Sequence, residues 1–196
     1  MVRELARRAK EAQAAGALAT AAQRNGALER IALLLEEQKD QILTANEADL
    51  SAAAGLPAPM VARLRLNESK LAASAQGVRD VARLPDMLGE HMSAWSRPNG
   101  LHIRQVRVPL GVIGMIYEAR PNVTVDAAVL CLKAGNAVLL KGGKEAAHSN
   151  TALGAVLRAG LEAAGLPPDL VQVLPSNREA ARELMTAVGL VDVLIP

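Results

Sequence analysis

One polar segment of the sequence, Tyr117–Asn122 ("YEARPN"), follows an apolar run and contains residues that can bind an anion. Arg120 offers a planar guanidinium that matches a phosphate or a carboxylate, and Asn122 can cap a helix that begins near Val123. The amino terminus of that helix would add a partial positive charge. The segment therefore predicts an anion pocket. The alternative is that Arg120 is a solvated loop residue and Asn122 only a helix cap.

A second polar segment, Lys141–Glu145 ("KGGKE"), follows the apolar run "NAVLL". Its paired glycines, Gly142 and Gly143, would let a ligand approach the backbone, and Lys141 and Lys144 would attract a phosphate. The alternative is a surface loop with solvated lysines. Because ligands of an open parallel sheet bind beyond the carboxyl ends of its strands, both segments are candidates for one binding edge.

Other residues that could do chemistry lack the neighbours that the chemistry needs. Cys131 is the only cysteine and lies in "VLCLK" with no base beside it, which is typical of a small buried hydrophobe. His91, His102 and His148 do not have the spacing of metal ligands, and no Ser-His-Asp set is recognisable. Gly111–Gly114 resembles half of a dinucleotide fingerprint, but it precedes its strand instead of following it. We therefore expect no metal site, and we judge Cys131 to be structural.

The first half of the chain has the pattern of helices. Val2–Leu84 is rich in Ala, Leu, Glu, Arg and Gln, with apolar residues three and four positions apart. Its breaks predict about four helices, one of them capped by Asn67. Prolines and glycines interrupt any helix between residues 87 and 100, and "RPNG" predicts a turn there.

The second half alternates short apolar runs with helical stretches. Strands are expected at "LHIRQVRV", "GVIGMIY", "NAVLLK", "LVQVL" and "VDVLI", and helices at residues 123–134, 146–164 and 178–188. Such alternation indicates right-handed crossovers and a parallel sheet. The fold class is therefore α/β: an N-terminal helical segment and connector (1–100), followed by part of a Rossmann-like parallel sheet with helices on both faces (101–196). The chain ends directly after a strand, so we expect an incomplete domain.

Composition narrows the classes of function. The chain has 196 residues that are 51% hydrophobic, which is enough for a core, but only 1% are aromatic, which disfavours stacking on nucleic-acid bases. The charges of the 22 basic and 20 acidic residues nearly cancel, so the chain has no strong overall positive potential that would attract a polyanionic partner. A single cysteine fits a reducing compartment, and no leader or membrane-spanning apolar run is visible. We expect a cytoplasmic protein that binds neither nucleic acid nor membrane.

Three motifs together resemble one known family. They are "VPLGVIGMIYEARPNVTVDAAVLCLKAGNAVLLKGGKEAAHSN", the preceding "WSRPNGLHIRQVRVPLG" and "ANEADLSAAAGLPAPMVARLRL". They closely resemble the γ-glutamyl phosphate reductases, also called glutamate-5-semialdehyde dehydrogenases, of the aldehyde dehydrogenase superfamily. The resemblance implies a cofactor domain on a parallel sheet, a catalytic domain and an oligomerising arm. It also implies NADPH-dependent reduction of L-glutamyl 5-phosphate to glutamate 5-semialdehyde with release of phosphate, a step of proline biosynthesis.

The same resemblance suggests roles for cofactor-binding residues. Lys141 matches the superfamily lysine that holds the adenosine ribose. Lys144 falls where many NAD-using relatives carry a glutamate that grips the ribose 2'-hydroxyl, so a lysine there favours NADP(H). The remaining cofactor-binding candidates are Gly143 on the same loop, Ile116 and Tyr117 on the nicotinamide side, and Ser176 and Asn177 near the cofactor phosphates.

The resemblance also suggests which residues bind the substrate and where the nucleophilic cysteine lies. Arg120 stands where ordinary aldehyde dehydrogenases have an oxyanion-stabilising asparagine, so Arg120, with Asn122, is expected to serve the acyl phosphate or carboxylate of the substrate. The family's nucleophilic cysteine, which forms a thioester, lies downstream of anything in this chain. We therefore expect the catalytic domain to be absent and the isolated chain to be inactive. A homo-oligomer of the full-length protein and functional coupling to glutamate 5-kinase are also expected.

Two other interpretations remain open from the sequence. The chain could be a stand-alone nucleotide-binding or interaction module without catalytic activity. It could also belong to a dehydrogenase with a different acyl-phosphate or aldehyde substrate, although relatives that use unactivated aldehydes carry a different loop in place of "YEARPN".

Overall fold

A computed structural model describes residues 1–196 as an α/β fold with a helical amino-terminal half. The elements in chain order are α1 (Val2–Gly16), α2 (Ala21–Glu37), α3 (Lys39–Ala52), α4 (Ala58–Leu64), α5 (Glu68–Arg83), β1 (His91–Ser96), β2 (His102–Val106), β3 (Val112–Ile116), α6 (Asn122–Lys133), β4 (Ala137–Lys141), the 3-10 turn η1 (Lys144–Ala146), α7 (Ala147–Ala163), the 3-10 turn η2 (Pro168–Leu170), β5 (Val171–Val173), α8 (Arg178–Met185) and β6 (Val193–Ile195).

The central sheet has four parallel strands in the order β5-β4-β3-β6. The chain proceeds from β3 to β4 to β5 in one direction and then returns to place β6 on the other side of β3. The strand order therefore reverses at β3, and ligands bind at such switch points in open α/β sheets. Ile116 pairs with Lys141 at the carboxyl ends of β3 and β4, so the two polar segments begin at neighbouring positions. The predicted α/β fold with a parallel sheet is confirmed.

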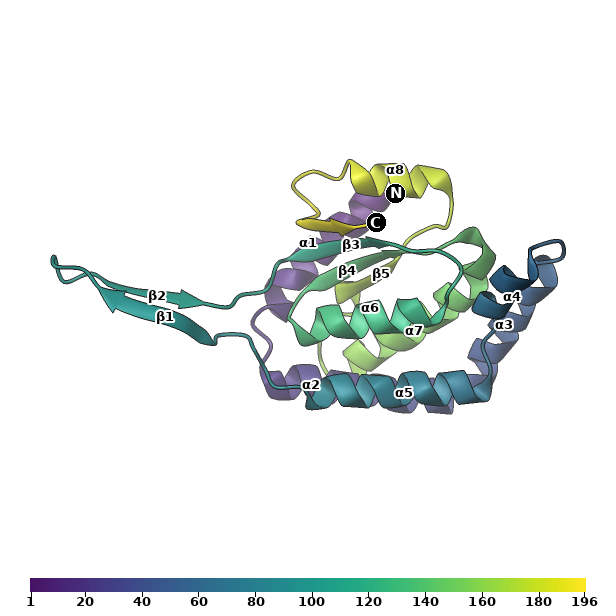
Figure 1. The fold of residues 1–196 in the computed structure, drawn as a ribbon, viewed down its shortest axis with the longest axis horizontal. Coiled ribbons are helices and arrows are strands. Elements are labelled where there is room, and N and C mark those ends of the chain that lie inside the picture. Colours follow the sequence, from purple (N-terminus) through teal and green to yellow (C-terminus); the bar gives the residue numbers. More distant parts are fainter.

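Helices cover both faces of this sheet in layers (Figure 1). On one face lie α6 and α7, which are covered in turn by α2 and α5, while α1 and α8 lie on the other face. The close packing of α2 on α7 depends on Gly160, because a Cβ there would lie 2.4 Å from a side-chain carbon of Ile31. The amino-terminal helices thus pack directly against the sheet unit.

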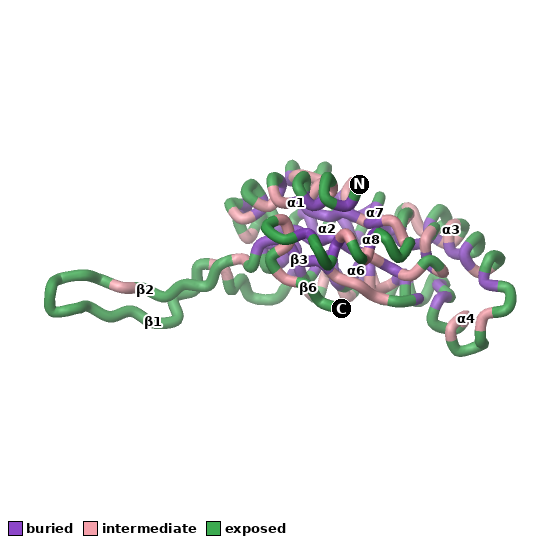
Figure 2. Tube along the Cα trace, turned by 90° about the horizontal axis from the view of Figure 1, so that it is seen from above, coloured by how far each residue is buried: buried purple, intermediate pink, exposed green.

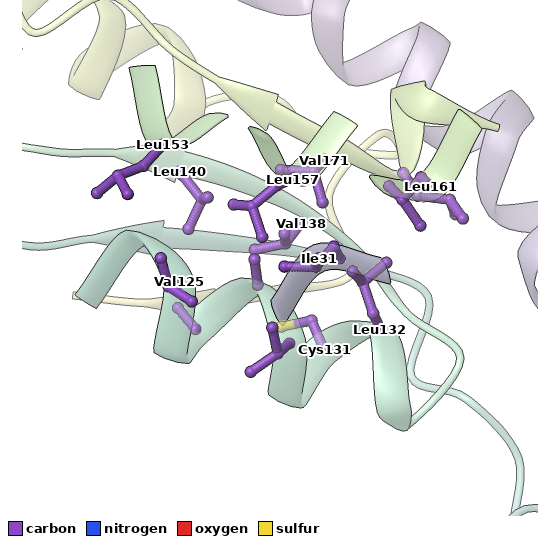
Figure 3. Packing of buried hydrophobic residues seen from close by; sticks show 14 of the residues in the cluster. Ile31, Val125, Cys131, Leu132, Val138, Leu140, Leu153, Leu157, Leu161 and Val171 are labelled. Carbon is purple, nitrogen blue, oxygen red and sulfur yellow. The ribbon is translucent and has the colours of Figure 1, made fainter. Parts of the chain in front are cut away.

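One hydrophobic core of 39 buried residues joins the two halves of the chain. Figure 3 shows its centre, where Ile31 of α2 lies among leucines and valines of α6, α7 and the strands. The side chains are almost entirely Ala, Leu, Val and Ile, as the near absence of aromatic residues requires. Burial of this apolar surface is the main stabilising contribution to such a fold.

An antiparallel hairpin of β1 and β2 projects from the amino end of the sheet (Figure 2). The expected strand at "LHIRQVRV" is present as β2, and "RPNG" forms the expected turn, with Gly100 at φ +83°. Strand β1, however, lies in residues 87–100, where only interruptions were expected; its exposed sequence, "HMSAWS", has no apolar alternation to mark it. The division at residue 100 falls in the turn of this hairpin and stays a prediction.

Two local expectations about helices are corrected. The amino-terminal half has five helices instead of about four, because α2 ends at Glu37 and α3 begins at Lys39, a break that no glycine or proline marks. Asn122 does not cap α6: the helix already begins at Asn122, and its Nδ2 donates to Asp126 at 3.2 Å. The carboxyl end of α6 is as expected, with Gly135 at φ +72° and the Asn136 amide donating to the Cys131 carbonyl at 2.9 Å.

None of the helices combines the length and apolar character that a membrane span requires.

Candidate functional site

The two polar segments meet at the carboxyl edge of the sheet. The Tyr117 amide donates to the Lys141 carbonyl at 3.1 Å, which extends the β3–β4 pairing into both loops. A Cβ placed on Gly143 would lie 3.5 Å from the Ala119 amide nitrogen, so the loops remain in contact beyond the strands. The edge predicted from the sequence is therefore one continuous surface built from both segments.

The larger cleft on this edge lies beyond the carboxyl ends of β3 and β6. Its volume is about 600 Å³, which is within the range of small-molecule sites. It combines the loop after β3 with the helix α4, which lies beyond the same end of the sheet (Figure 1). Its lining residues are Met60, Arg63, Ile116, Tyr117, Glu118, Ala119, Arg120, Val123 and Pro196. The structure thus brings Ile116, Tyr117 and Arg120 together but leaves Asn122 outside the lining.

A second cleft, of about 280 Å³, lies between the amino-terminal ends of α7 and α8. Ser176 and Asn177 line it, as do Gly142 and Asn150. The Asn177 side chain caps α8 by accepting from the Ala180 amide at 2.8 Å. The side-chain oxygen of Asn177 is therefore used by the helix cap, while the Ser176 hydroxyl remains available to a ligand.

Neither lysine of "KGGKE" lines a cleft: both lie within two residues of Gly142, which lines the smaller one, and neither has a carboxylate partner. Lys141 is partly buried at the end of β4, and Lys144 is exposed at the start of η1. The ion pairs of the chain are all formed by other residues. Both ammonium groups are thus free to pair with an anionic ligand.

A buried hydrogen-bond chain supports the loop after β3 from behind. Thr124 donates to Oδ1 of Asn150 at 2.9 Å, so the Tyr117 hydroxyl, 2.7 Å from Thr124 Oγ1, is the donor in the other bond. Burial raises the pKa of Tyr117 to about 12, although the Thr124 bond opposes this shift. Tyr117 is therefore neutral at physiological pH, and its ring is held in place beside the larger cleft.

Gly142 is required by this hydrogen-bond chain as well as by the loop. A Cβ at Gly142 would lie 2.1 Å from Nδ2 of Asn150 and 3.2 Å from the Tyr117 ring. The lack of a side chain at Gly142 was expected to let a ligand approach the backbone. It also leaves the space that the Asn150 side chain occupies. Thr124 and Asn150 could not be singled out from the sequence, because other polar residues stand beside them in the first turns of α6 and α7.

The amino terminus of α7 is capped by a side chain from α3. Asp49, which is 3% exposed, accepts from the amides of His148 and Ser149 at 3.0 and 2.8 Å, and from the Ser149 hydroxyl at 2.6 Å. Asp49 also lies 2.8 Å from Nδ1 of the exposed His148. This carboxylate neutralises the helix terminus that would otherwise attract an anion. A phosphate at this edge must therefore rely on other donors, such as the lysines.

Cys131 lies in the core (Figure 3) and lines neither cleft. It is 6% exposed on α6, and burial raises the pKa of its thiol to about 11. A neutral thiol among aliphatic side chains is a poor nucleophile. No group of three or more His, Cys, Asp and Glu side chains is placed to hold a metal ion.

A sequence profile of the aldehyde dehydrogenase family matches residues 1–194. The chain belongs to the aldehyde dehydrogenase family. Members of this family use NAD or NADP. The parallel sheet and its covering helices thus match the amino-terminal, NAD-binding portion of the aldehyde dehydrogenase fold.

Individual aldehyde dehydrogenase relatives are similar over the whole chain. A gamma-glutamyl phosphate reductase of Symbiobacterium thermophilum is 65% identical over 197 residues, which cover 100% of this chain and 46% of the relative. The crystal structure of gamma-glutamyl phosphate reductase from Thermotoga maritima superposes with a TM-score of 0.97 at 36% identity, over 100% of this chain and 48% of its own. A glyceraldehyde-3-phosphate dehydrogenase of Methanocaldococcus jannaschii, complexed with NADP, shares the fold with a TM-score of 0.74 at 17% identity, over 98% of this chain and 40% of its own.

The chain spans about half the length of the curated relatives that it matches and corresponds to their amino-terminal part. The aldehyde dehydrogenase assignment therefore applies to the part of the fold that carries the parallel sheet.

Proposed function

We propose that this chain is the amino-terminal, NADP-binding part of a γ-glutamyl phosphate reductase. The full-length enzyme would reduce L-glutamyl 5-phosphate to glutamate 5-semialdehyde, releasing phosphate, as a step of proline biosynthesis. The observation that carries this proposal is the 65% identity to a named gamma-glutamyl phosphate reductase across the whole chain. The matched region includes the "YEARPN" and "KGGKE" segments, because it spans the whole chain.

We assign the NADP site to the smaller cleft and the adjoining "KGGKE" loop. The smaller cleft is lined by Gly142, Ser176 and Asn177, whose small or polar side chains suit a nucleotide. Lys141 and Lys144 would supply positive charge for the ribose and its 2'-phosphate. The Glu145 carboxylate, whose Oε2 lies 2.6 Å from a Cβ built on Gly143, would have to move for the cofactor to contact the Gly143 backbone. When bound, the cofactor would supply a hydride; the residues of this chain bind and orient it.

The larger cleft is the candidate for the nicotinamide side and the substrate. Ile116 and Tyr117 form one wall, and the exposed Arg120 can reach an anion in the cleft. Asn122 is committed to Asp126 by its side-chain nitrogen, so its predicted role in binding substrate would have to use its oxygen. No cysteine lines either cleft, so a catalytic cysteine would have to come from a separate domain.

The proposal is tested by assay of the full-length protein that contains this sequence. Glutamate 5-semialdehyde, NADP and phosphate are expected to yield NADPH, while the isolated chain yields none. The stand-alone module, the main alternative, predicts nucleotide binding without turnover in either case. Turnover by the isolated chain that Cys131→Ser abolishes would overturn the structural assignment of Cys131. A preference for another acyl phosphate or aldehyde would favour the third interpretation.

Lys144→Glu tests the cofactor assignment in the same enzyme. A glutamate there would repel the 2'-phosphate and could bind the ribose 2'-hydroxyl, so the KM for NADPH should rise about tenfold or more with little change for NADH. Equal losses with both cofactors would remove the argument. The homo-oligomer, the coupling to glutamate 5-kinase and the cytoplasmic location stay predictions.

A further inference from the structure

The larger cleft contains a second arginine, Arg63, contributed by α4. Arg63 and Arg120 are far apart in the sequence, and both are exposed side chains that line the same space. Other arginines, such as Arg79 and Arg158, are held by carboxylates at 2.7 and 2.9 Å. Arg63 and Arg120 belong to no ion pair of the structure. Two unpaired guanidinium groups therefore face one cleft.

The position of α4 is fixed by buried contacts next to Arg63. Leu64 is fully buried in a small apolar cluster with Ala53 and Ala146. The Asn46 side chain, 1% exposed, donates to the Leu64 carbonyl at 2.9 Å and accepts from the Leu66 amide at 2.8 Å. These bonds hold the backbone at the carboxyl end of α4. The Cα of Arg63 is thereby held at the rim of the cleft, and only its side chain needs to be ordered by a ligand.

The charges of the cleft match an anionic amino-acid derivative. Its only carboxylate is Glu118, so with Arg63 and Arg120 the lining carries two positive charges and one negative charge. The proposed substrate carries an acyl phosphate at one end and an α-carboxylate and an ammonium at the other. Guanidinium groups bind both kinds of oxyanion by paired hydrogen bonds. A single arginine could serve only one of the two anionic ends.

We propose that Arg63 is a substrate-binding residue that acts together with Arg120 to hold the two anionic groups of the substrate. This inference rests on the proposed function of the same cleft. It assigns to α4, a helix outside the sheet, a direct part in recognition. Asn46 is then a positioning residue, because it holds α4 over the cleft without reaching it.

The test compares three variants of the full-length enzyme in the reaction of glutamate 5-semialdehyde, NADP and phosphate. Arg63→Ala should raise the KM for phosphate or for the semialdehyde by roughly ten- to hundredfold, as expected for a lost hydrogen bond to a charged group, with a smaller effect on kcat. Arg63→Lys should recover part of the loss, because the charge returns without the planar fork. Arg65→Ala is the matched control: an exposed arginine two residues further on that does not line the cleft, so its constants should stay unchanged.

The two KM values identify the group that Arg63 binds. A selective rise for phosphate assigns Arg63 to the acyl phosphate, and a selective rise for the semialdehyde assigns it to the α-carboxylate. Unchanged constants in Arg63→Ala, with an active wild-type enzyme, would overturn this inference and leave the proposed function standing. An inactive wild-type enzyme would overturn both. Equal melting temperatures of the variants would exclude misfolding as the cause of a rise.

Discussion

At the scale of single residues, the carboxyl edge depends on contacts that its own residues make with one another. Gly142 lacks a side chain where Asn150 must pass, and Asn150 in turn fixes Thr124 and, through it, Tyr117. The polar loop that was predicted to bind an anion is therefore supported by a buried chain of neutral hydrogen bonds. Such chains stabilise the fold only when each donor finds its acceptor, because an unpaired buried polar group is costly.

Gly142→Ala should destabilise the fold because its Cβ would overlap Nδ2 of Asn150. The expected loss is about 1–3 kcal/mol, the usual cost of overpacking. Gly77→Ala is the control: Gly77 lies within α5 with no atom within 4 Å of an added Cβ, so this change should stabilise by about 0.5–1 kcal/mol. Urea unfolding of both variants measures the two effects. Equal destabilisation would argue against the close contact at Gly142.

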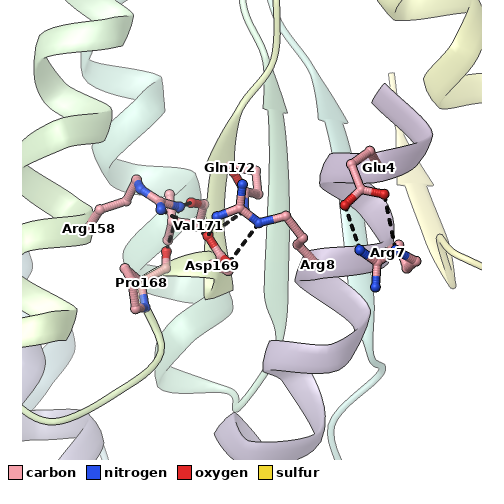
Figure 4. Close-up of polar contacts among 8 residues, drawn as sticks. All are labelled: Glu4, Arg7, Arg8, Arg158, Pro168, Asp169, Val171 and Gln172. Carbon is pink, nitrogen blue, oxygen red and sulfur yellow. Dashed lines mark hydrogen bonds and ion pairs between the residues drawn. The ribbon is translucent and has the colours of Figure 1, made fainter. Parts of the chain in front are cut away.

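Elements of the fold are connected by carboxylates that bridge helices distant in sequence. Asp169, next to β5, accepts bidentate hydrogen bonds from Arg8 of α1 at 2.9 and 2.8 Å and another from Arg158 of α7 at 2.9 Å (Figure 4). Asp49 joins α3 to the start of α7 in the same manner. A few carboxylate contacts thus help to orient helices whose mutual packing cannot be read from the sequence of either helix.

The Asp169 bridge predicts a dependence of stability on pH. Partial burial by itself would raise the pKa of Asp169, but the hydrogen bonds from Arg158 and Arg8 outweigh it and lower the pKa. A carboxyl with a lowered pKa in the folded state contributes stability that is present above its unfolded pKa, about 3.9, and is lost as the pH falls towards the folded value. In a plot of melting temperature against pH, Asp169→Asn should therefore lessen the decrease below about pH 4, the acid limb of the curve. An unchanged limb would show that the bridge contributes nothing measurable.

Asp49→Asn should weaken the attachment of α7. An amide presents only one acceptor oxygen to donors that now use both carboxylate oxygens, so a loss of about 1–3 kcal/mol is expected. The matched control is Asp40→Asn, which removes an exposed carboxylate from the first turn of α3 and should cost about 0.3–1 kcal/mol at most. Chemical denaturation distinguishes them. Similar losses would mean that Asp49 acts only through its charge near the helix terminus.

The whole molecule consists of one core with a separate projection. None of the 39 core residues belongs to the β1–β2 hairpin, whereas every helix except the short α4 contributes. The sheet, its covering helices and the two clefts should therefore fold as one unit. The exposed hairpin carries Trp95, which is 46% exposed, and other apolar side chains without partners in the chain.

Removal of the hairpin should leave the body folded. Glu90 and Arg107 close its root, because the Arg107 amide donates to the Glu90 carbonyl at 3.1 Å and their side chains form an ion pair at 2.8 Å. Residues 91–106 can therefore be replaced by a two-residue Asn-Gly turn without moving the ends. We expect the helical circular dichroism and the cooperative melting transition to persist. Loss of cooperative melting would show that the hairpin takes part in the core.

The sequence by itself determined the local elements and the edge on which the candidate site lies. Strands β3 and β4 and helix α6 are set by short apolar runs, helical periodicity and the glycine that ends α6, which are properties of neighbouring residues. Because parallel strands end at the same edge, the meeting of "YEARPN" and "KGGKE" followed from that pattern. The tertiary structure alone decided which distant residues join them: Arg63 in the larger cleft, Asn150 behind Gly142, and Asp49 of α3 at the start of α7. These contacts depend on how helices dock through the shared core, and periodicity along one segment carries no information about which distant segment will lie against it.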